Sequence, residues 1–477
     1  MVRHTCFRFC LDPTVEQATV LDRYAGAARF AYNQCLATVK SALTARDSDP
    51  DVEVPWSGFD LINYINAWKK SEAAGRMFTV DAGGVAAVTV TGLAWRSEVC
   101  QQVFEEAAVD CGRALAGWSA SRSGIRHGRR VGFPQFKKKT DVTQRFRIRS
   151  KQSARGRSTI RVGDDGITRS ITLPVLGTIR VREDTRRLRR MLAGGRAKIL
   201  FATITRRAGR WHVSVNVEAA DLHSDRRHPP RSPQDCAGWV GVDRGLSVFL
   251  VAATCGGREL DRVTDAPRAL AAGLRRQRRL AKAVTRKRKG SNNRRRATAR
   301  VARHHTRVAA RRRHFLHEVS ARLVKTHDRL VLEDLNTAGM LANRHLARAI
   351  SDAGWGQFAR LVGYKQQWRG GQVLLADRWF PSTRTCSGCG NVNRALTLAD
   401  RVFACECGHS LDRDLNAAIN LAAWGEKHYR AQVREPEARA PVINVRRRDG
   451  AGPHSGVGGT VPDDAETDTH TTSVTMG

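Results

Sequence analysis

The chain has 477 residues, enough for about two to four domains that bury hydrophobic cores without disulfides. Its 82 Lys and Arg against 45 Asp and Glu give a formal net charge of +37, and a surface this basic binds polyphosphate. We therefore expect a nucleic acid as partner. A ribosomal-type basic protein and a protein that coats anionic membrane are the alternatives, but neither explains the cysteine and carboxylate patterns described below.

Two further features bear on the compartment. No run of about 18 apolar residues occurs, and the first residues lack the apolar core of a signal peptide, so we expect a cytoplasmic, bacterial-type, nucleoid-associated protein with no membrane partner. Four of the eleven cysteines crowd into one segment, which indicates a metal site instead of disulfides. The scattered cysteines we interpret as ordinary half-buried thiols: Cys6, Cys10, Cys35, Cys100, Cys111, Cys236 and Cys255.

The first part of the chain reads as a strand followed by helices. Residues 3–11 alternate in polarity, and Thr14 with Gln17 forms the pattern of a helix-capping box. Apolar residues recur at helical spacing after Thr14 and again over 95–118, which predicts a helical lobe over 12–122.

From 123 to 222 the texture becomes β-like, with short segments such as VGFPQF, RFRIRS and RWHVSVNVE between Gly and Pro. We expect a small β-barrel here. This segment concentrates positive charge, which favours a phosphate-facing surface. The basic residues are Lys137, Lys138, Lys139, Arg145, Arg147, Arg149 and Lys151.

A polar, Pro-rich linker at 223–235 precedes a region of α/β texture. The apolar strand in VGVDRGL opens this region. The segment 268–313 is then predicted to be a long helical stretch, with nineteen Arg or Lys and no acid. Because like charges at helical spacing repel, we expect an anionic partner along it.

The remaining elements are the strand in RLVLEDLN, an amphipathic helix in GWGQFARLVGYKQQWRGG, the strand QVLLADRWF and a helix in LNAAINLAAWGEKHY. The segment 429–477 is polar and rich in Gly, Pro, Asp and Thr, so we expect it to be disordered.

Two close cysteine pairs, Cys386/Cys389 and Cys405/Cys407, have the spacing that brings four thiolates to a tetrahedral zinc. The second pair is C-x-C where C-x-x-C is more usual, so His409 is an alternative fourth ligand. Four protein ligands leave no position for water, so this metal is predicted to be structural.

Three carboxylates sit at the ends of apolar elements: Asp243, Glu333 and Asp414. Taken singly, each fits a structural role, since Asp243 could cap a turn and Asp414 could cap a helix. Asp334 competes with Glu333 for any functional role. Taken jointly, three such acids in one α/β domain can converge on a pair of divalent cations that hydrolyse a phosphodiester.

Five motifs resemble, in order, those of the TnpB family, the OrfB-type proteins of insertion sequences: VGVDRGL, LVLEDLN, NTAGMLANRHLARAISDAGWGQF, DRWFPSTRTCSGCG and CGHSLDRDLNAAINL. The similarity extends to an N-terminal helix-turn-helix-like segment and covers most of residues 5–425, weakest at about 45–90. The family has been called a transposase and is related to the type V CRISPR nucleases.

The resemblance implies an RNA-guided DNA endonuclease with a RuvC-like nuclease of RNase H fold. By motif, Asp243 is the first acid, Glu333 the second and Asp414 the third, with Asp412 as competitor; Asp414 is preferred because it stands two residues before Asn416. The implied cofactors are structural Zn²⁺, two catalytic Mg²⁺ and a guide RNA, and the implied partner is double-stranded target DNA.

The implied fold class is multidomain α/β, with these segments: 1–11, first strand of a wedge barrel; 12–122, helical recognition lobe; 123–222, wedge-like barrel; 223–235, linker; 236–385, RuvC-like nuclease with basic helices; 386–408, zinc ribbon; 409–428, last RuvC segment; 429–477, tail. Two alternative functions are a transposase acting directly on insertion-sequence ends and an RNA-guided DNA-binding repressor that does not cut.

Overall fold

The computed structural model describes residues 3–80, 83–84, 86–126, 128–139, 143–152, 158–164, 166–219, 226–397 and 399–434. Among these residues the chain divides into two compact units, the first ending at Ala219 and the second beginning at Arg226. The last described helix reaches Arg434, so the expected tail does not begin at 429. The rest of that segment, 435–477, lies outside the described residues.

The first unit contains a seven-stranded sheet in the order β4-β8-β9-β1-β7-β6-β5. Strand β1 lies at its centre, paired antiparallel with β9 along most of its length and with β7 at Leu11 and Asp12. The order ends at β4 and β5, so the closed barrel stays a prediction. The bounds are β1 Arg3–Asp12, β4 Arg145–Arg149, β5 Arg161–Val162, β6 Ser170–Leu173, β7 Gly177–Val181, β8 Ala197–Arg207 and β9 Arg210–Ala219, with helix α4 at Arg186–Ala193.

One expected strand is wrong: VGFPQF forms no strand, because Pro134 has no N–H to donate to a ladder. Phe133 in this segment instead packs edge-on against Trp118, with ring centroids 5.1 Å apart.

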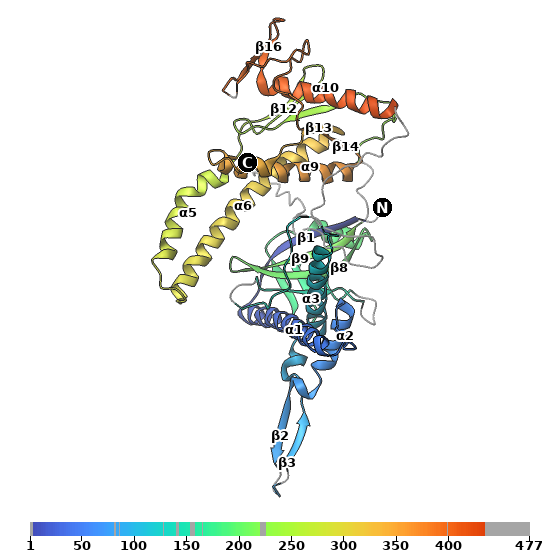
Figure 1. Cartoon of the computed structure of the whole chain (residues 1–477), viewed down its shortest axis with the longest axis vertical. Helices are drawn as coiled ribbons and strands as arrows, with labels where there is room; N and C mark the ends of the chain where they lie inside the picture. Colours follow the sequence, from blue (N-terminus) through green and yellow to red (C-terminus); the bar gives the residue numbers. More distant parts are fainter. Residues whose placement is uncertain are drawn as a thin grey trace. The chain divides into compact units, whose positions relative to one another are not determined.

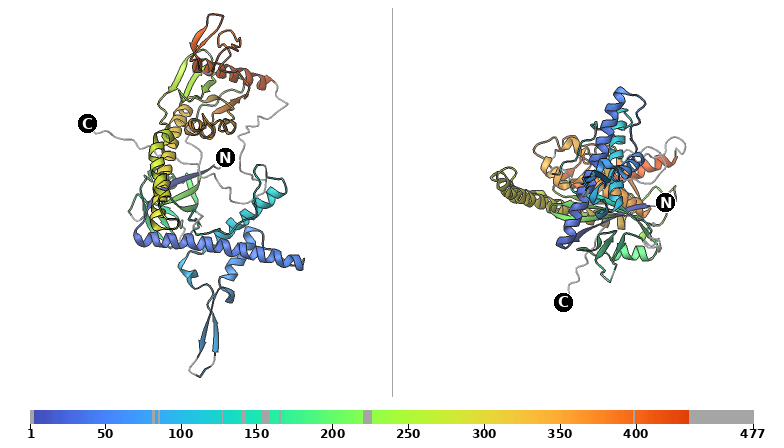
Figure 2. Two further views of the ribbon diagram at one scale, coloured as in Figure 1. Left: turned by 60° about the vertical axis from the view of Figure 1, so that its left-hand side comes forward. Right: turned by 90° about the horizontal axis from the view of Figure 1, so that it is seen from below.

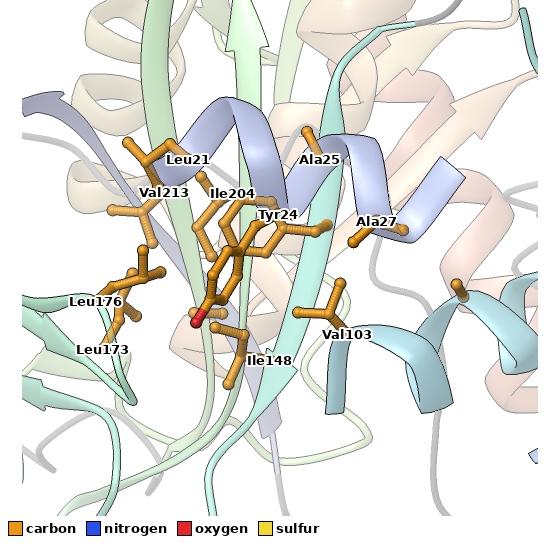
Figure 3. Close-up of a cluster of buried hydrophobic side chains, with 14 of the residues drawn as sticks. Leu21, Tyr24, Ala25, Ala27, Val103, Ile148, Leu173, Leu176, Ile204 and Val213 are labelled. Carbon is orange, nitrogen blue, oxygen red and sulfur yellow. The ribbon is translucent and has the colours of Figure 1, made fainter. Parts of the chain in front are cut away.

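Helices α1 (Val15–Ser48) and α3 (Gln101–Arg122) pack on this sheet, and α2 (Gly58–Trp68) packs on α3 and α1. The capping box is confirmed, because Thr14 accepts from the Gln17 backbone N–H and the Gln17 side chain accepts from the Thr14 N–H. Figure 3 shows Leu21 and Tyr24 of α1 lying over Ile148 and Val213 of the sheet, with Val103 of α3 beside them. Residues Val15–Ser48, within the segment that resembles a helix-turn-helix, form one continuous helix.

A hairpin absent from the predictions lies between α2 and α3. Strands β2 (Arg76–Val80) and β3 (Ala86–Val90) pair antiparallel and extend away from the helices (Figure 2). The β-type residues in RMFTV and AAVTV, on either side of Gly83-Gly84, were a usable sequence signal for this hairpin. Short 3-10 helices at Glu72–Ala74 and Ala94–Glu98 flank the hairpin.

The second unit is built on a mixed five-stranded sheet in the order β12-β11-β10-β13-β14. Strands β10, β11 and β12 form an antiparallel meander, whereas β10, β13 and β14 run parallel. The bounds are β10 Val240–Asp243, β11 Leu250–Thr254, β12 Glu259–Val263, β13 Arg329–Glu333 and β14 Gln372–Ala376.

Helices cover both faces of this sheet (Figure 1). Val242 and Leu332 point to one face, where they pack with Leu323 of α6 (Asn292–Thr326) and Phe358 of α9 (Trp355–Arg369). The alternate residue Val331 points to the other face, covered by α10 (Arg413–Arg434). Short helices α7 (Thr337–Met340) and α8 (Ala347–Ala353) connect β13 to α9.

The basic stretch 268–313 is helical, as predicted, and is divided into two helices. It forms α5 (Ala269–Thr285) and the first part of α6, which turn back on each other at Gly290 and lie side by side (Figure 2). Their Arg and Lys side chains are mostly exposed. None of the helices in the described parts of the chain is both long enough and apolar enough to span a membrane.

Candidate active site and zinc ribbon

Asp243 is the last residue of β10 and is only 6% exposed. Burial raises the pKa of its carboxyl well above the usual value, and the charges of Glu333 and Asp414 raise this pKa further. The side chains of Arg244 and Arg413 oppose the shift. The second unit therefore brings the three predicted acids into electrostatic contact.

Glu333 ends β13, the strand that pairs parallel with β10. Because carboxyl ends of parallel strands meet at one edge of a sheet, Glu333 and Asp243 share that edge. The hydroxyl of Ser382 donates to Glu333 Oε1 at 2.8 Å. The neighbouring Asp334 is 44% exposed in its side chain and pairs with Arg378 at 2.6 Å.

Asp414 and Asp412 have different environments at the start of α10. Asp412 accepts from the Leu415 backbone N–H at 2.9 Å, the contact of a helix N-cap, and also pairs with Arg262. Asp414 is 8% exposed, and a Cβ added at Gly245, in the turn after Asp243, would lie 3.9 Å from its Oδ2. Asp414 thus faces the end of β10, while Asp412 caps the helix.

Close packing of α10 on the sheet sets this geometry. A Cβ at Gly241, in the middle of β10, would lie 1.9 Å from the Ala418 carbonyl oxygen. Gly425 lies farther along α10. A Cβ added there would lie 2.4 Å from Val331 Cγ2. Glycine at these two positions therefore lets α10 bring Asp414 against β10.

Arg244 is a site residue that the sequence analysis missed. It is 5% exposed, and its guanidinium donates to the backbone carbonyls of Glu333 and Trp355. It thereby ties the end of β13 to the start of α9. Its place directly after Asp243 was the available signal.

The four predicted cysteines come together beside α10. All four sulfurs lie within 4.8 Å of one another, and among the described residues no other group of three or more His, Cys, Asp or Glu ligands is this compact. The pairs Cys386–Cys407 and Cys389–Cys405 have S···S distances of 3.7 and 3.6 Å. A tetrahedron with Zn–S of about 2.3 Å requires about 3.8 Å, so the cluster fits zinc.

The backbone around the cluster favours the thiolate of Cys386, whereas the pKa values of the Cys389, Cys405 and Cys407 thiols are raised. Burial raises the pKa of the Cys386 thiol, but N–H groups of Cys389 and Gly388 outweigh this and lower the pKa to about 6. His409 lies outside the cluster, with its Nε2 3.0 Å from Ser387 Oγ. A small sheet of β15 (Val402–Ala404) and β16 (Ser410–Asp412) supports the site.

Two asparagines of α10 hold the ribbon to the active-site edge, and the sequence analysis gave neither this role. Asn416 accepts from the Ser387 N–H at 3.0 Å and donates to the Thr385 carbonyl at 2.7 Å. Asn420 donates to the carbonyls of Ser382 and Thr385. The loop that carries Ser382 is therefore fixed by the same helix that carries Asp414.

Comparison with family models gives three matches. Residues 212–344 match a model described as "Probable transposase", residues 355–421 match "Cas12f1-like, TNB domain", and residues 1–48 match "Helix-turn-helix domain".

Curated relatives match most of the chain. A protein of Mycobacterium tuberculosis H37Rv named "Putative RNA-guided DNA endonuclease Rv2885c" is 35% identical over 457 residues, covering 94% of this chain and 92% of its own. One of the same general name from Streptomyces pristinaespiralis is 33% identical, with 88% and 89% covered. InsQ of Escherichia coli K12, also so named, is 27% identical, with 89% and 93% covered.

Among solved structures, a Cas12f1 complex with guide RNA and target DNA aligns at 12% identity and a TM-score of 0.43, covering 88% of this chain and 99% of that one. The identity and coverage of the Mycobacterium relative, together with the OrfB-type models, decide the family. This chain belongs to the TnpB family, the OrfB-type proteins of insertion sequences.

Proposed function

We propose that this chain is an RNA-guided DNA endonuclease that hydrolyses phosphodiester bonds at Asp243, Glu333 and Asp414. The observation that carries the proposal is the position of the three acids at one edge of the sheet, where burial and the charges of Glu333 and Asp414 raise the pKa of Asp243. Structural packing alone gives no reason to bury carboxylates of like charge together. Perturbed carboxyls of this kind concentrate at functional sites.

The donor set suits Mg²⁺, because it consists of hard carboxylate oxygens whose crowded negative charge a divalent cation would neutralise. Bound Mg²⁺ would supply activation of water and stabilisation of the leaving oxygen. Asp243, Glu333 and Asp414 would hold two such ions. Ser382 fixes one oxygen of Glu333, and Arg244 fixes the backbone that presents it.

The sheet of the second unit supports the RuvC-like, RNase H assignment for 236–385 and 409–428. An antiparallel meander joined through its first strand to two parallel strands places the first two acids on adjacent strand ends. We also propose a zinc ribbon at 386–408, a recognition lobe at 12–122 and a wedge-like barrel at 1–11 and 123–222.

A guide RNA would supply sequence reading by base pairing with one strand of double-stranded DNA, as in other RNA-guided nucleases. The protein would supply backbone contacts, for which the net charge of +37 and the exposed cations of α5 and α6 are suited. The relatives' shared name supports this proposal.

The test uses purified protein with its co-expressed RNA and a DNA that matches the RNA. Asp243→Asn and Asp414→Asn should abolish cutting in Mg²⁺ and retain DNA binding. Asp412→Asn is the matched control, since asparagine also caps helices and should preserve cutting. Normal cutting by Asp414→Asn with loss in Asp412→Asn would reverse the assignment of the third acid.

The purified protein, tested with and without its RNA, also distinguishes the nuclease from the two alternative functions. Occupancy of matching DNA without cutting in Mg²⁺ or Mn²⁺ would indicate a repressor. Strand transfer of insertion-sequence ends in the absence of RNA would indicate a transposase, and we expect none.

A further inference from the structure

One tryptophan of this chain is unlike the other nine. All ten lie in the described residues, and nine are buried or half-buried, whereas Trp379 is 84% exposed. A large aromatic side chain left in water loses the free energy that its burial would contribute. Its position in the loop between β14 and the zinc ribbon is therefore the feature to explain.

The loop around Trp379 is anchored on both sides. Before it, Arg378 pairs with Asp334 at 2.6 Å and also donates to the Asp334 carbonyl. After it, the ring of Phe380 packs near Trp424 in a buried apolar cluster. Within the same turn, the Trp379 N–H donates to Asp377 Oδ1 at 2.8 Å.

The anchors tie the exposed ring to the acidic edge of the sheet. Asp334, the partner of Arg378, directly follows Glu333 in the chain, and Ser382, three residues after Trp379, donates to the Glu333 carboxylate. Loop residues 378–382 are thus attached twice to the end of β13. Trp379 itself is largely exposed and belongs to none of the hydrophobic clusters of the described residues.

We propose that Trp379 is a stacking platform for an unpaired nucleobase of the strand that enters the acidic site. Every base presents a π face, so such stacking needs no particular sequence. Arg384, which follows on the same segment before the ribbon, is exposed and suited to a flanking phosphate. This inference rests on the proposed nuclease site and adds a residue that positions its substrate.

The cutting test compares Trp379→Ala and Trp379→Phe with Val402→Ala, which removes an exposed apolar side chain of β15 and serves as control. Trp379→Ala should lower kcat/KM about tenfold, a typical effect of losing one base stack. Trp379→Phe should retain most activity and Val402→Ala all of it. Normal cutting by Trp379→Ala overturns the proposal, and favours a protein contact for this ring.

A second measurement does not depend on cutting. Full-length protein labelled with 5-fluorotryptophan is titrated with a short single-stranded DNA in EDTA, and the Trp379 resonance is identified by its absence in Trp379→Phe. The DNA should shift this resonance, whereas an abasic oligomer of the same length should not. Equal shifts with both oligomers, or none with either, overturn the stack.

The two experiments separate the two proposals. A base-dependent shift in a protein that never cuts would refute the nuclease and leave the stacking platform standing. Cutting that requires Asp243, together with an unmoved Trp379 resonance, would refute the platform alone.

Discussion

The folded protein disfavours the ionised form of Asp243, because this carboxyl is buried beside two other acids. Its raised pKa means that the folded chain binds a proton at this carboxyl more readily than the unfolded chain does. The free energy of unfolding therefore falls as the pH rises from the ordinary carboxyl range through the raised value. At neutral pH the metal-free site is a source of instability that bound cations would relieve.

This predicts opposite effects of Asp243→Asn on stability and on activity. The substitution removes the buried charge, so the metal-free variant should melt above the wild type in EDTA, while its cutting falls to background. Mg²⁺ should raise the Tm of the wild type and leave that of the variant nearly unchanged. An equal Mg²⁺ response in both proteins would separate Asp243 from the metal site.

At the scale of elements, the sequence predicted the parts more completely than their contacts. Apolar strands ending in Asp243 and Glu333, and the cysteine spacing, followed from local patterns. The role of Gly241 did not, because glycine within a strand reports close approach only once the approaching element is known. Asn416 and Asn420 likewise look like ordinary helix residues until the ribbon loop is placed beside them.

Some boundaries and side-chain directions could not be predicted from the sequence, for physical reasons. Periodicity cannot separate α5 from α6, since the turn at Gly290 interrupts a run whose composition does not change. The hairpin β2–β3 interrupts a lobe that otherwise has helical periodicity. The distinct roles of Asp412 and Asp414 depend on which way each points from the first turn of α10, which spacing alone does not fix.

The packing of α10 on the sheet yields a prediction for Gly241→Ala. The added methyl would meet the Ala418 carbonyl, so the helix must shift, and we expect a loss of about 1–3 kcal/mol with lower Tm and weaker cutting. Gly26→Ala in α1 is the control, since its Cβ would meet nothing within 4 Å and helix propensity favours alanine. Equal Tm changes in the two variants would contradict this account.

The ribbon yields a prediction about metal content. Purified protein should contain about one zinc per chain by atomic emission, and Cys389→Ser should lose it together with stability of the second unit. His409→Ala should keep its zinc, because His409 lies outside the sulfur cluster. Loss of zinc in His409→Ala, but not in Cys407→Ser, would make the histidine the fourth ligand.

At the scale of the whole molecule, charge dominates. A net charge of +37 makes affinity for nucleic acid largely a matter of counterion release, whatever sequence is read. The four exposed arginines of α5, at positions 275, 276, 278 and 279, concentrate this property on one helix. No acid of α5 offsets them.

Replacing these four arginines by glutamine should therefore weaken binding to DNA of any sequence and flatten its salt dependence. If all four contact phosphates, the slope of log K against log salt should fall by about 3–4, at about 0.9 per contact. Fluorescence anisotropy over a range of KCl concentrations measures this slope. An unchanged slope would place the nucleic acid elsewhere on the protein.

The position of α10 at the end of the described chain also governs when the site can form. Asp243 and Glu333 leave the ribosome well before Asp414, and at about 5–20 residues per second the third acid follows Glu333 on the order of ten seconds later. During that interval the edge of the sheet lacks its covering helix. A chain whose synthesis has stopped before α10 thus has two of the three acids, and the proposed active site can form only after α10 has been made.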